Sequence, residues 1–253
     1  MGFSIASDGL VSINHGTNHF AITTLNTGKS PCITNSKCHR FPINIHSVYF
    51  RPKNPKNAKS EGDNCPFIYA WKKKHPKLYI TRYSLKEMRL DFYIILDRLV
   101  ENIIKDHYVD FIVPLPSKHG LALNLATRLQ RRLPNSVILF DIFIKKPNSE
   151  ILEEIYDLNI IHSDRTQLTN AISRANALNR NFSISDIPTN LRGYLDPLKV
   201  NTALLKNGTY LLVDDLFATG ATLLNAKDKL ISLNSNINVL GSVLFGPYNN
   251  RIR

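Results

Sequence analysis

The sequence predicts an α/β fold with a parallel sheet flanked by helices, over residues 81–253. Short apolar runs alternate there with longer segments whose apolar residues recur at helical spacing, which is typical of β-α-β units. The segment before it, residues 1–80, is irregular and basic. With 253 residues, 43% of them hydrophobic and 21% charged, the chain is long enough for a sizeable core and too apolar for general disorder.

The predicted elements follow one another from Ser84 onward. A helix of about five turns begins there, because Ser84 and Glu87 form a capping box before apolar residues that recur as far as Ile103. Residues 145–180 are polar and indicate either a long loop or a small helical excursion. The other expected elements are a strand over Val109–Val113, a helix over Gly120–Arg132, a strand over Val137–Ile144, a strand over Thr209–Val213, a helix over Thr219–Leu233 and a strand over Ile237–Phe245.

The N-terminal segment, residues 1–80, carries most of the excess positive charge. It contains 11 Lys or Arg and 3 Asp or Glu, which gives +8 of the total net charge of +12. Prolines interrupt this part, and a few short apolar runs, such as Ile43–Phe50 and Phe67–Trp71, could be strands. The charge is compatible with a nucleic-acid partner and equally with a solvated surface.

Several classes of protein are excluded or disfavoured. No apolar run approaches the roughly 20 residues that span a bilayer, so no membrane association is expected. The start of the chain does not have the pattern of a secretory signal. Three scattered cysteines, Cys32, Cys38 and Cys65, form no disulfide framework, which favours a cytoplasmic protein. With His39 and His46 they would make a loosely spaced zinc site, and the alternative is partly buried free thiols.

One stretch, Tyr210–Thr222, carries most of the chemical information. An apolar strand runs into Asp214 and Asp215, and a short loop then leads to Thr219-Gly220-Ala221-Thr222 at the start of a helix. A parallel strand delivers the two acids to the carboxyl edge of the sheet, where open α/β folds bind ligands. Two carboxylates accept hydrogen bonds from a vicinal diol, and backbone N–H groups at a helix start bind an anion. Together these features indicate a site for a 5-phosphoribosyl group.

This stretch resembles the phosphoribosyl-pyrophosphate signature of the type I phosphoribosyltransferases. In that family an acidic pair is followed by two variable residues and then Thr or Ala before Thr-Gly-x-Thr, so Ala218 is an accepted variant. The resemblance implies a Mg²⁺-dependent transfer of 5-phosphoribosyl from phosphoribosyl pyrophosphate to a nitrogen acceptor, with release of pyrophosphate. It assigns ribose and Mg²⁺ binding to Asp214 and Asp215. It assigns phosphate binding to Ala218, Thr219, Gly220, Ala221 and Thr222.

Two further segments resemble the competence-protein-F-like subgroup of this family. The loop Pro114–Gly120 takes the place of the pyrophosphate loop, in which Ser117 supplies backbone donors and Lys118 a cation. The basic stretch between the second and third core strands resembles a mobile lid, so Arg174, Arg165 or Lys145 would meet the charge of the leaving pyrophosphate. The alternatives are an ordinary strand exit and solvated loop residues.

The resemblance leaves the acceptor and the role of the N-terminal segment open. Residues 1–80 are either a hood over the acceptor or an accessory region. Lys72-Lys73-Lys74 beside Trp71 suggests either nucleic-acid contact or, as the favoured interpretation, a strand with a solvated lysine face. Besides an active transferase, the site is compatible with a non-catalytic sensor of phosphoribosyl compounds or with an effector in a nucleic-acid-handling system. The association state, with a homodimer among the alternatives, is also open.

Overall fold

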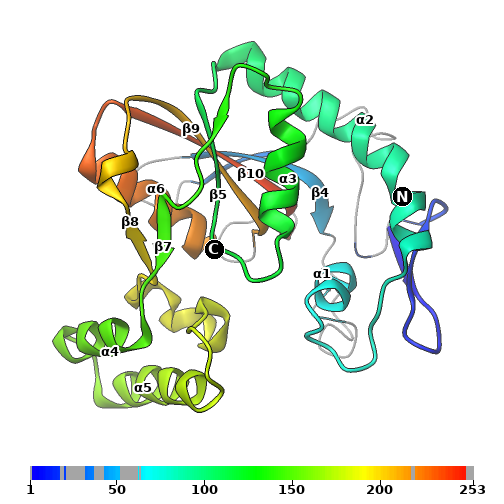
Figure 1. Ribbon diagram of the computed structural model, residues 1–253. Coiled ribbons are helices and arrows are strands. Elements are labelled where there is room, and N and C mark those ends of the chain that lie inside the picture. The colour runs from blue at the N-terminus through cyan, green and yellow to red at the C-terminus, as the bar shows by residue number, and fades with distance from the viewer. Residues whose placement is uncertain are drawn as a thin grey trace.

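A six-stranded sheet with the strand order β3-β4-β10-β9-β5-β6 forms the centre of the molecule (Figure 1). Strands β4, β10, β9, β5 and β6 are parallel to one another, and β3 is antiparallel to β4. Their bounds are β3 (Cys32–Ser36), β4 (Ile43–Arg51), β5 (Phe111–Pro114), β6 (Val137–Ile138), β9 (Gly208–Leu216) and β10 (Ile237–Tyr248). The structure is a computed structural model, and the residues it describes are 2–17, 20, 32–36, 43–51, 62, 64–217 and 220–248.

Helices pack on both faces of this sheet. Alternate side chains of a strand point to opposite faces, so Leu211 and Val213 of β9 join one core while Tyr210 and Leu212 join the other. The first core is shared with α2 (Arg82–Asp106) and α3 (Leu121–Gln130), and the second with α6 (Ala221–Leu233). The predicted α/β fold, a parallel sheet flanked by helices, is therefore confirmed. Within the described part of the chain, no helix is both long and apolar enough to cross a membrane.

The N-terminal segment contributes directly to this fold. Strand β4 lies inside the sheet, between β3 and β10, as the apolar run at Ile43–Phe50 suggested. A hairpin of β1 (Gly2–Ile5) and β2 (Val11–Asn14) precedes it. The second apolar run forms a helix, α1 (Pro66–Trp71), and not a strand. A run of five apolar residues has no decisive period, and Pro66 supplies a favourable first helical residue.

The start of α2 also differs from the prediction. Thr81 is the N-cap, and its Oγ1 accepts a hydrogen bond from the Ser84 amide at 3.2 Å. The capping box with Ser84 as the cap is therefore wrong, and Ser84 lies inside the first turn with its hydroxyl 3.1 Å from Thr81 Oγ1. Threonine is itself a good N-cap, and capping there lets the helix begin three residues earlier.

The expected strand over Val137–Ile144 is divided in two. Strand β6 ends at Ile138, and Asp141 adopts a left-handed conformation with φ +59°, which turns the chain away from the sheet. Strand β7 (Phe143–Lys145) then pairs with β8 (Leu198–Val200) in a separate antiparallel ribbon. Between them lies a helical insertion, so the second of the two alternatives for this region is correct. Its elements are α4 (Asn148–Asp157), α5 (His162–Ala177), η1 (Ile184–Asp186) and η2 (Thr189–Tyr194), and η3 (Thr202–Leu204) follows β8.

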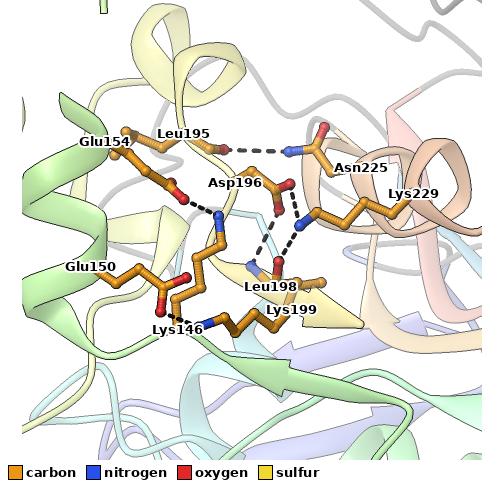
Figure 2. A network of polar contacts seen from close by, with 9 residues as sticks. All are labelled: Lys146, Glu150, Glu154, Leu195, Asp196, Leu198, Lys199, Asn225 and Lys229. Carbon is orange, nitrogen blue, oxygen red and sulfur yellow. Dashed lines mark hydrogen bonds and ion pairs between the residues drawn. The ribbon is translucent and has the colours of Figure 1, made fainter. Parts of the chain in front are cut away.

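The insertion has its own apolar core, in which residues of α4 and α5 pack against Phe182 and Leu191. Polar contacts at its base, drawn in Figure 2, join it to α6 and to the β7–β8 ribbon. The contacts to α6 are Lys229 Nζ to Asp196 at 2.7 Å, Lys229 to the Leu198 carbonyl, and Asn225 Nδ2 to the Leu195 carbonyl at 3.3 Å. The ribbon adds the ion pairs Lys146–Glu154 and Lys199–Glu150. The helix that follows the Thr-Gly-x-Thr motif therefore also holds the insertion.

The C-terminus of α1 is closed by a left-handed residue. Lys73 has φ +51°, its amide donates to the Ala70 carbonyl at 3.2 Å, and the Lys74 amide donates to the Tyr69 carbonyl at 2.9 Å. This pair of bonds defines a Schellman motif, in which glycine usually takes the left-handed position. Lysine there carries the steric cost of a Cβ at positive φ.

Replacing Lys73 by glycine is therefore expected to stabilise the protein. The gain should be about 1 kcal/mol, since relief of the left-handed strain exceeds the extra entropy of glycine in the unfolded chain. Urea denaturation measures it, and Lys73→Ala is the control because it removes the charge but keeps the Cβ. An equal gain in both variants would contradict the explanation.

His46 of β4 is buried, and neither ring nitrogen has a hydrogen-bond partner among the described residues. Its pKa is lowered to about 4, chiefly by burial and also by the positive charge of His107, while Asp106 acts in the opposite direction. In the unfolded chain this histidine has an ordinary pKa near 6.5. Between about pH 6.5 and pH 4 the unfolded chain is therefore protonated at His46, whereas the folded chain is not. This residue therefore favours unfolding as the pH falls from about 6.5 to about 4.

His46→Leu should consequently flatten the acid side of the stability profile. The wild type should lose on the order of 3 kcal/mol more than the variant between pH 7.5 and pH 4. Urea unfolding at several pH values measures the difference, and His162→Leu, an exposed histidine, serves as the control. Parallel profiles for the wild type and His46→Leu would show that the buried ring does not titrate as described.

Candidate functional site

Asp214 and Asp215 lie near the carboxyl end of β9, with β10 on one side of this strand and β5 on the other. Because these three strands are parallel, their carboxyl ends share one edge of the sheet, the usual ligand-binding edge of open α/β folds. Helix α1 and the α4–α5 insertion both lie below the sheet in the view of Figure 1, toward the same edge of it. The acidic pair is therefore placed where the sequence predicts it.

The two acids have different surroundings. Strand alternation puts Asp215 on the face of Val213 and Asp214 on the face of Leu212. The contacts agree, because Asp215 meets Lys72 of the α1 region, whereas Asp214 lies within electrostatic reach of Lys145 at the end of β7. Neither carboxylate faces a purely apolar interior.

Asp215 forms a buried ion pair with Lys72. The Lys72 Nζ lies 2.8 Å from Oδ1 and 2.6 Å from Oδ2, so it contacts both oxygens of the carboxylate. Only 14% of the Lys72 side chain and 5% of the Asp215 side chain are exposed. Little water reaches the pair to screen it, so the charges interact strongly.

Asp214 is half-buried, and its Oδ1 accepts a hydrogen bond from the Asp215 amide at 2.8 Å. The pKa of Asp214 is raised to about 7, chiefly by burial and also by the negative charge of Asp215, while Lys72, the Asp215 amide and Lys145 act in the opposite direction. A negative charge on this side chain is therefore costly without a ligand. A hydroxyl donor or a cation placed beside it would relieve that cost.

The loop after β9 leads directly into α6. Gly220 is the N-cap of this helix in a left-handed conformation, with φ +79°. A Cβ at Gly220 would lie 2.2 Å from Cζ of Phe217, so both the backbone and the packing require glycine. Ala221 and Thr222 occupy the first turn of this helix, the end at which helices bind anions. Ala218 and Thr219, also predicted to bind phosphate, lie outside the described residues.

The expected pyrophosphate loop connects β5 to α3. Ser117 Oγ accepts the His119 amide at 3.5 Å, and Lys118 is exposed. The Trp71 indole donates to the His119 carbonyl at 3.2 Å, which joins the loop to α1. Burial lowers the pKa of His119, and the charges of Lys72, Lys118 and Lys74 lower it further. Several cations therefore surround this loop.

The three basic residues predicted for the lid lie in different places relative to the acidic pair. Arg174 is exposed on α5, and among the described residues no hydrogen bond or ion pair joins it to the acidic pair. Arg165 donates to the Leu158 carbonyl at 2.8 Å, within the insertion. Lys145 lies within electrostatic reach of Asp214: burial and Lys72 lower its pKa, whereas Asp186 and Asp214 raise it. Lys145 is thus the candidate that the structure brings near Asp214.

Two basic residues of the site were missed by the sequence analysis. Lys72 was expected on a solvated strand face, which is wrong, since it follows α1 and is paired with Asp215. Arg51 at the end of β4 is 2% exposed, and its guanidinium donates at 2.8 Å to the carbonyls of both Gly246 and Phe217. It thereby holds the point where the loop leaves β9. Only a charged residue at the end of an apolar run signalled it.

The donor set fits Mg²⁺ only in part. Mg²⁺ is usually bound through one or two carboxylates together with water and substrate phosphates. Asp214 has a carboxylate oxygen beyond the one that accepts the Asp215 amide and fits as such a ligand, whereas both oxygens of Asp215 contact Lys72. No group of three or more His, Cys, Asp or Glu side chains suited to a metal occurs in the described part.

The structure describes only some of the residues of the possible zinc site. Cys65 is a buried free thiol, and burial raises its pKa to about 12, so it is inert at neutral pH. Cys38 and His39 lie outside the described residues, and of Cys32 only the backbone in β3 is described.

Comparison with known proteins adds no family assignment: no model of a protein family matches the chain, and no curated protein matches it. The fold and the site therefore define an α/β protein with a five-stranded parallel sheet and a charged site at its carboxyl edge.

Arg51→Met is expected to destabilise the protein by about 2–4 kcal/mol, because two buried carbonyls lose their donor. Urea unfolding measures the loss, and Arg98→Met, at an exposed position of α2, is the control. A change no larger than that of an ordinary surface substitution, about 0.5 kcal/mol, would show that the guanidinium does not hold the ends of β9 and β10.

Proposed function

We propose that this chain is a phosphoribosyltransferase that moves 5-phosphoribosyl from phosphoribosyl pyrophosphate to a nitrogen acceptor and releases pyrophosphate. The observation that supports this most is the placement of the signature. The acidic pair ends a central parallel strand, and Gly220 caps the following helix in a left-handed conformation. This is the strand–loop–helix context that a sugar-phosphate site requires.

Asp214 is the residue best placed to bind the ribose. Its carboxylate borders the sheet edge and is only half-buried, so it can accept a hydrogen bond from a ribose hydroxyl. As the bond to pyrophosphate breaks, positive charge gathers on the ribose ring. A nearby carboxylate stabilises that charge without forming a covalent bond.

Phosphate groups would lie between two sources of positive potential. The first turn of α6, which includes Thr222, would place its positive helix end and the Thr222 hydroxyl toward the 5-phosphate. Lys145, Lys118 and the backbone near Ser117 would face the leaving pyrophosphate, while the exposed Arg174 would reach it only if the insertion moved. Mg²⁺ bound to the pyrophosphate would neutralise part of its charge.

The alternative of nucleic-acid binding through the lysine run has less support. Trp71 is stacked on Phe67, with ring centroids 6.1 Å apart, and its indole donates to His119. Lys72 is paired with Asp215. The aromatic ring and the first lysine of the run are therefore engaged inside the protein, where they cannot stack on bases or follow a phosphate backbone.

Calorimetric titration with phosphoribosyl pyrophosphate and Mg²⁺ tests the proposal. Asp214→Asn and Thr222→Val should each weaken binding at least tenfold, which corresponds to about 1.4 kcal/mol. Asp106→Asn, at the exposed end of α2, should bind as the wild type does. Absence of binding by the wild type at millimolar ligand would refute the proposal.

An enzyme and a non-catalytic sensor would give the same titration, so a second measurement separates them. Incubation with phosphoribosyl pyrophosphate and a panel of nitrogenous bases, followed by mass spectrometry and pyrophosphate detection, should yield a nucleotide product. Tight binding without a product from any base would favour the sensor.

A further inference from the structure

The contact between Lys72 and Asp215 determines how the acidic pair can be used. One ammonium group lies 2.8 Å and 2.6 Å from the two oxygens of the same carboxylate. A metal ion that bound Asp215 directly would have to displace this ammonium or lie beside it. Both are unfavourable, because the pair is buried and two cations at this distance repel each other strongly.

The packing of α1 against the core fixes the position of Lys72. Phe67 of α1 lies with its ring centroid 5.5 Å from that of Phe3 and 5.6 Å from that of Phe245. The Trp71 indole is fixed on the His119 carbonyl. The Schellman turn then sends Lys73 into solvent, directly after Lys72. The ammonium is therefore held at Asp215 by the packing of α1.

The two acids consequently differ in what they can offer a ligand. Asp215 is neutralised by an internal cation, whereas Asp214 has no described ion pair and faces the other side of β9. Lys145 influences Asp214 electrostatically, and no described hydrogen bond or ion pair joins the two side chains. One carboxylate of the pair is thus occupied and the other is accessible.

We propose that Lys72 is the resident cation of this site: it positions Asp215 and takes the place of a metal there, so that Asp214 alone faces the ligand. Any Mg²⁺ then enters with the pyrophosphate of the substrate and is not held by Asp215. The identity of that substrate rests on the proposed function, whereas the role of Lys72 does not.

Titration of the full-length protein with MgCl₂, and separately with MnCl₂, tests this without any substrate. Lys72→Met should bind both ions at least tenfold more tightly than the wild type, because two adjacent carboxylates lose their cation. Lys73→Met should equal the wild type, since that lysine is exposed. Lys72→Arg should also equal the wild type, because it restores the positive charge.

A double variant, Lys72→Met with Asp215→Asn, should lose the gain and so localise it to Asp215. If Lys72→Met does not fold, as circular dichroism would reveal, Lys72→Gln replaces it, because glutamine keeps a donor toward Asp215 without the charge. Equal metal affinity in the wild type and in the folded uncharged variant would overturn the inference.

The metal titration and the test of the proposed function can fail independently of each other. A wild type that fails to bind phosphoribosyl pyrophosphate refutes the proposed function, whatever the metal titration gives. A wild type that binds it, together with unchanged metal affinity in Lys72→Met, refutes the role of Lys72 alone.

Discussion

The buried ion pair between Lys72 and Asp215 joins the first third of the chain to the central strand of the sheet. It depends on two packings: β9 buried on both faces, and α1 held against Phe3 and Phe245. Without the lysine, Asp215 would be a buried charge with no opposite charge, which costs several kcal/mol. The basic N-terminal segment is thus part of the site as well as of the sheet, to which it contributes β4.

The parallel sheet could be predicted from the sequence because its signals are local. The run Tyr210–Val213 is apolar throughout, as strands buried on both faces are, and Gly220 marks a turn that needs positive φ. Errors arose where local signals compete. Thr81 and Ser84 are both acceptable N-caps, and five apolar residues at Phe67–Trp71 suit a strand or a helix. The packing of the rest of the chain decided between them.

The acidic pair could be recognised in the sequence because its two members are adjacent. The cations around it could not be recognised, because they come from distant segments of the chain. Lys72 and Asp215 are separated by 143 residues, and Arg51 and Phe217 by 166. A sequence pattern carries no information about such pairs. Lys145 was one of several basic candidates, and only the fold of the β7–β8 ribbon distinguishes it from Arg174.

Strand geometry gives two neighbouring aspartates separate tasks. Successive residues point to opposite faces, so Asp215 meets the helix on one face while Asp214 meets the β7 side on the other. An acidic pair of this kind need not bind a diol through both carboxylates. Here one carboxylate fixes a lysine, and that lysine lowers the cost of ionising the other. One lysine of the basic N-terminal segment then has a specific role in the proposed function: Lys72 would make a site with two aspartates tolerable to the anionic substrate proposed above.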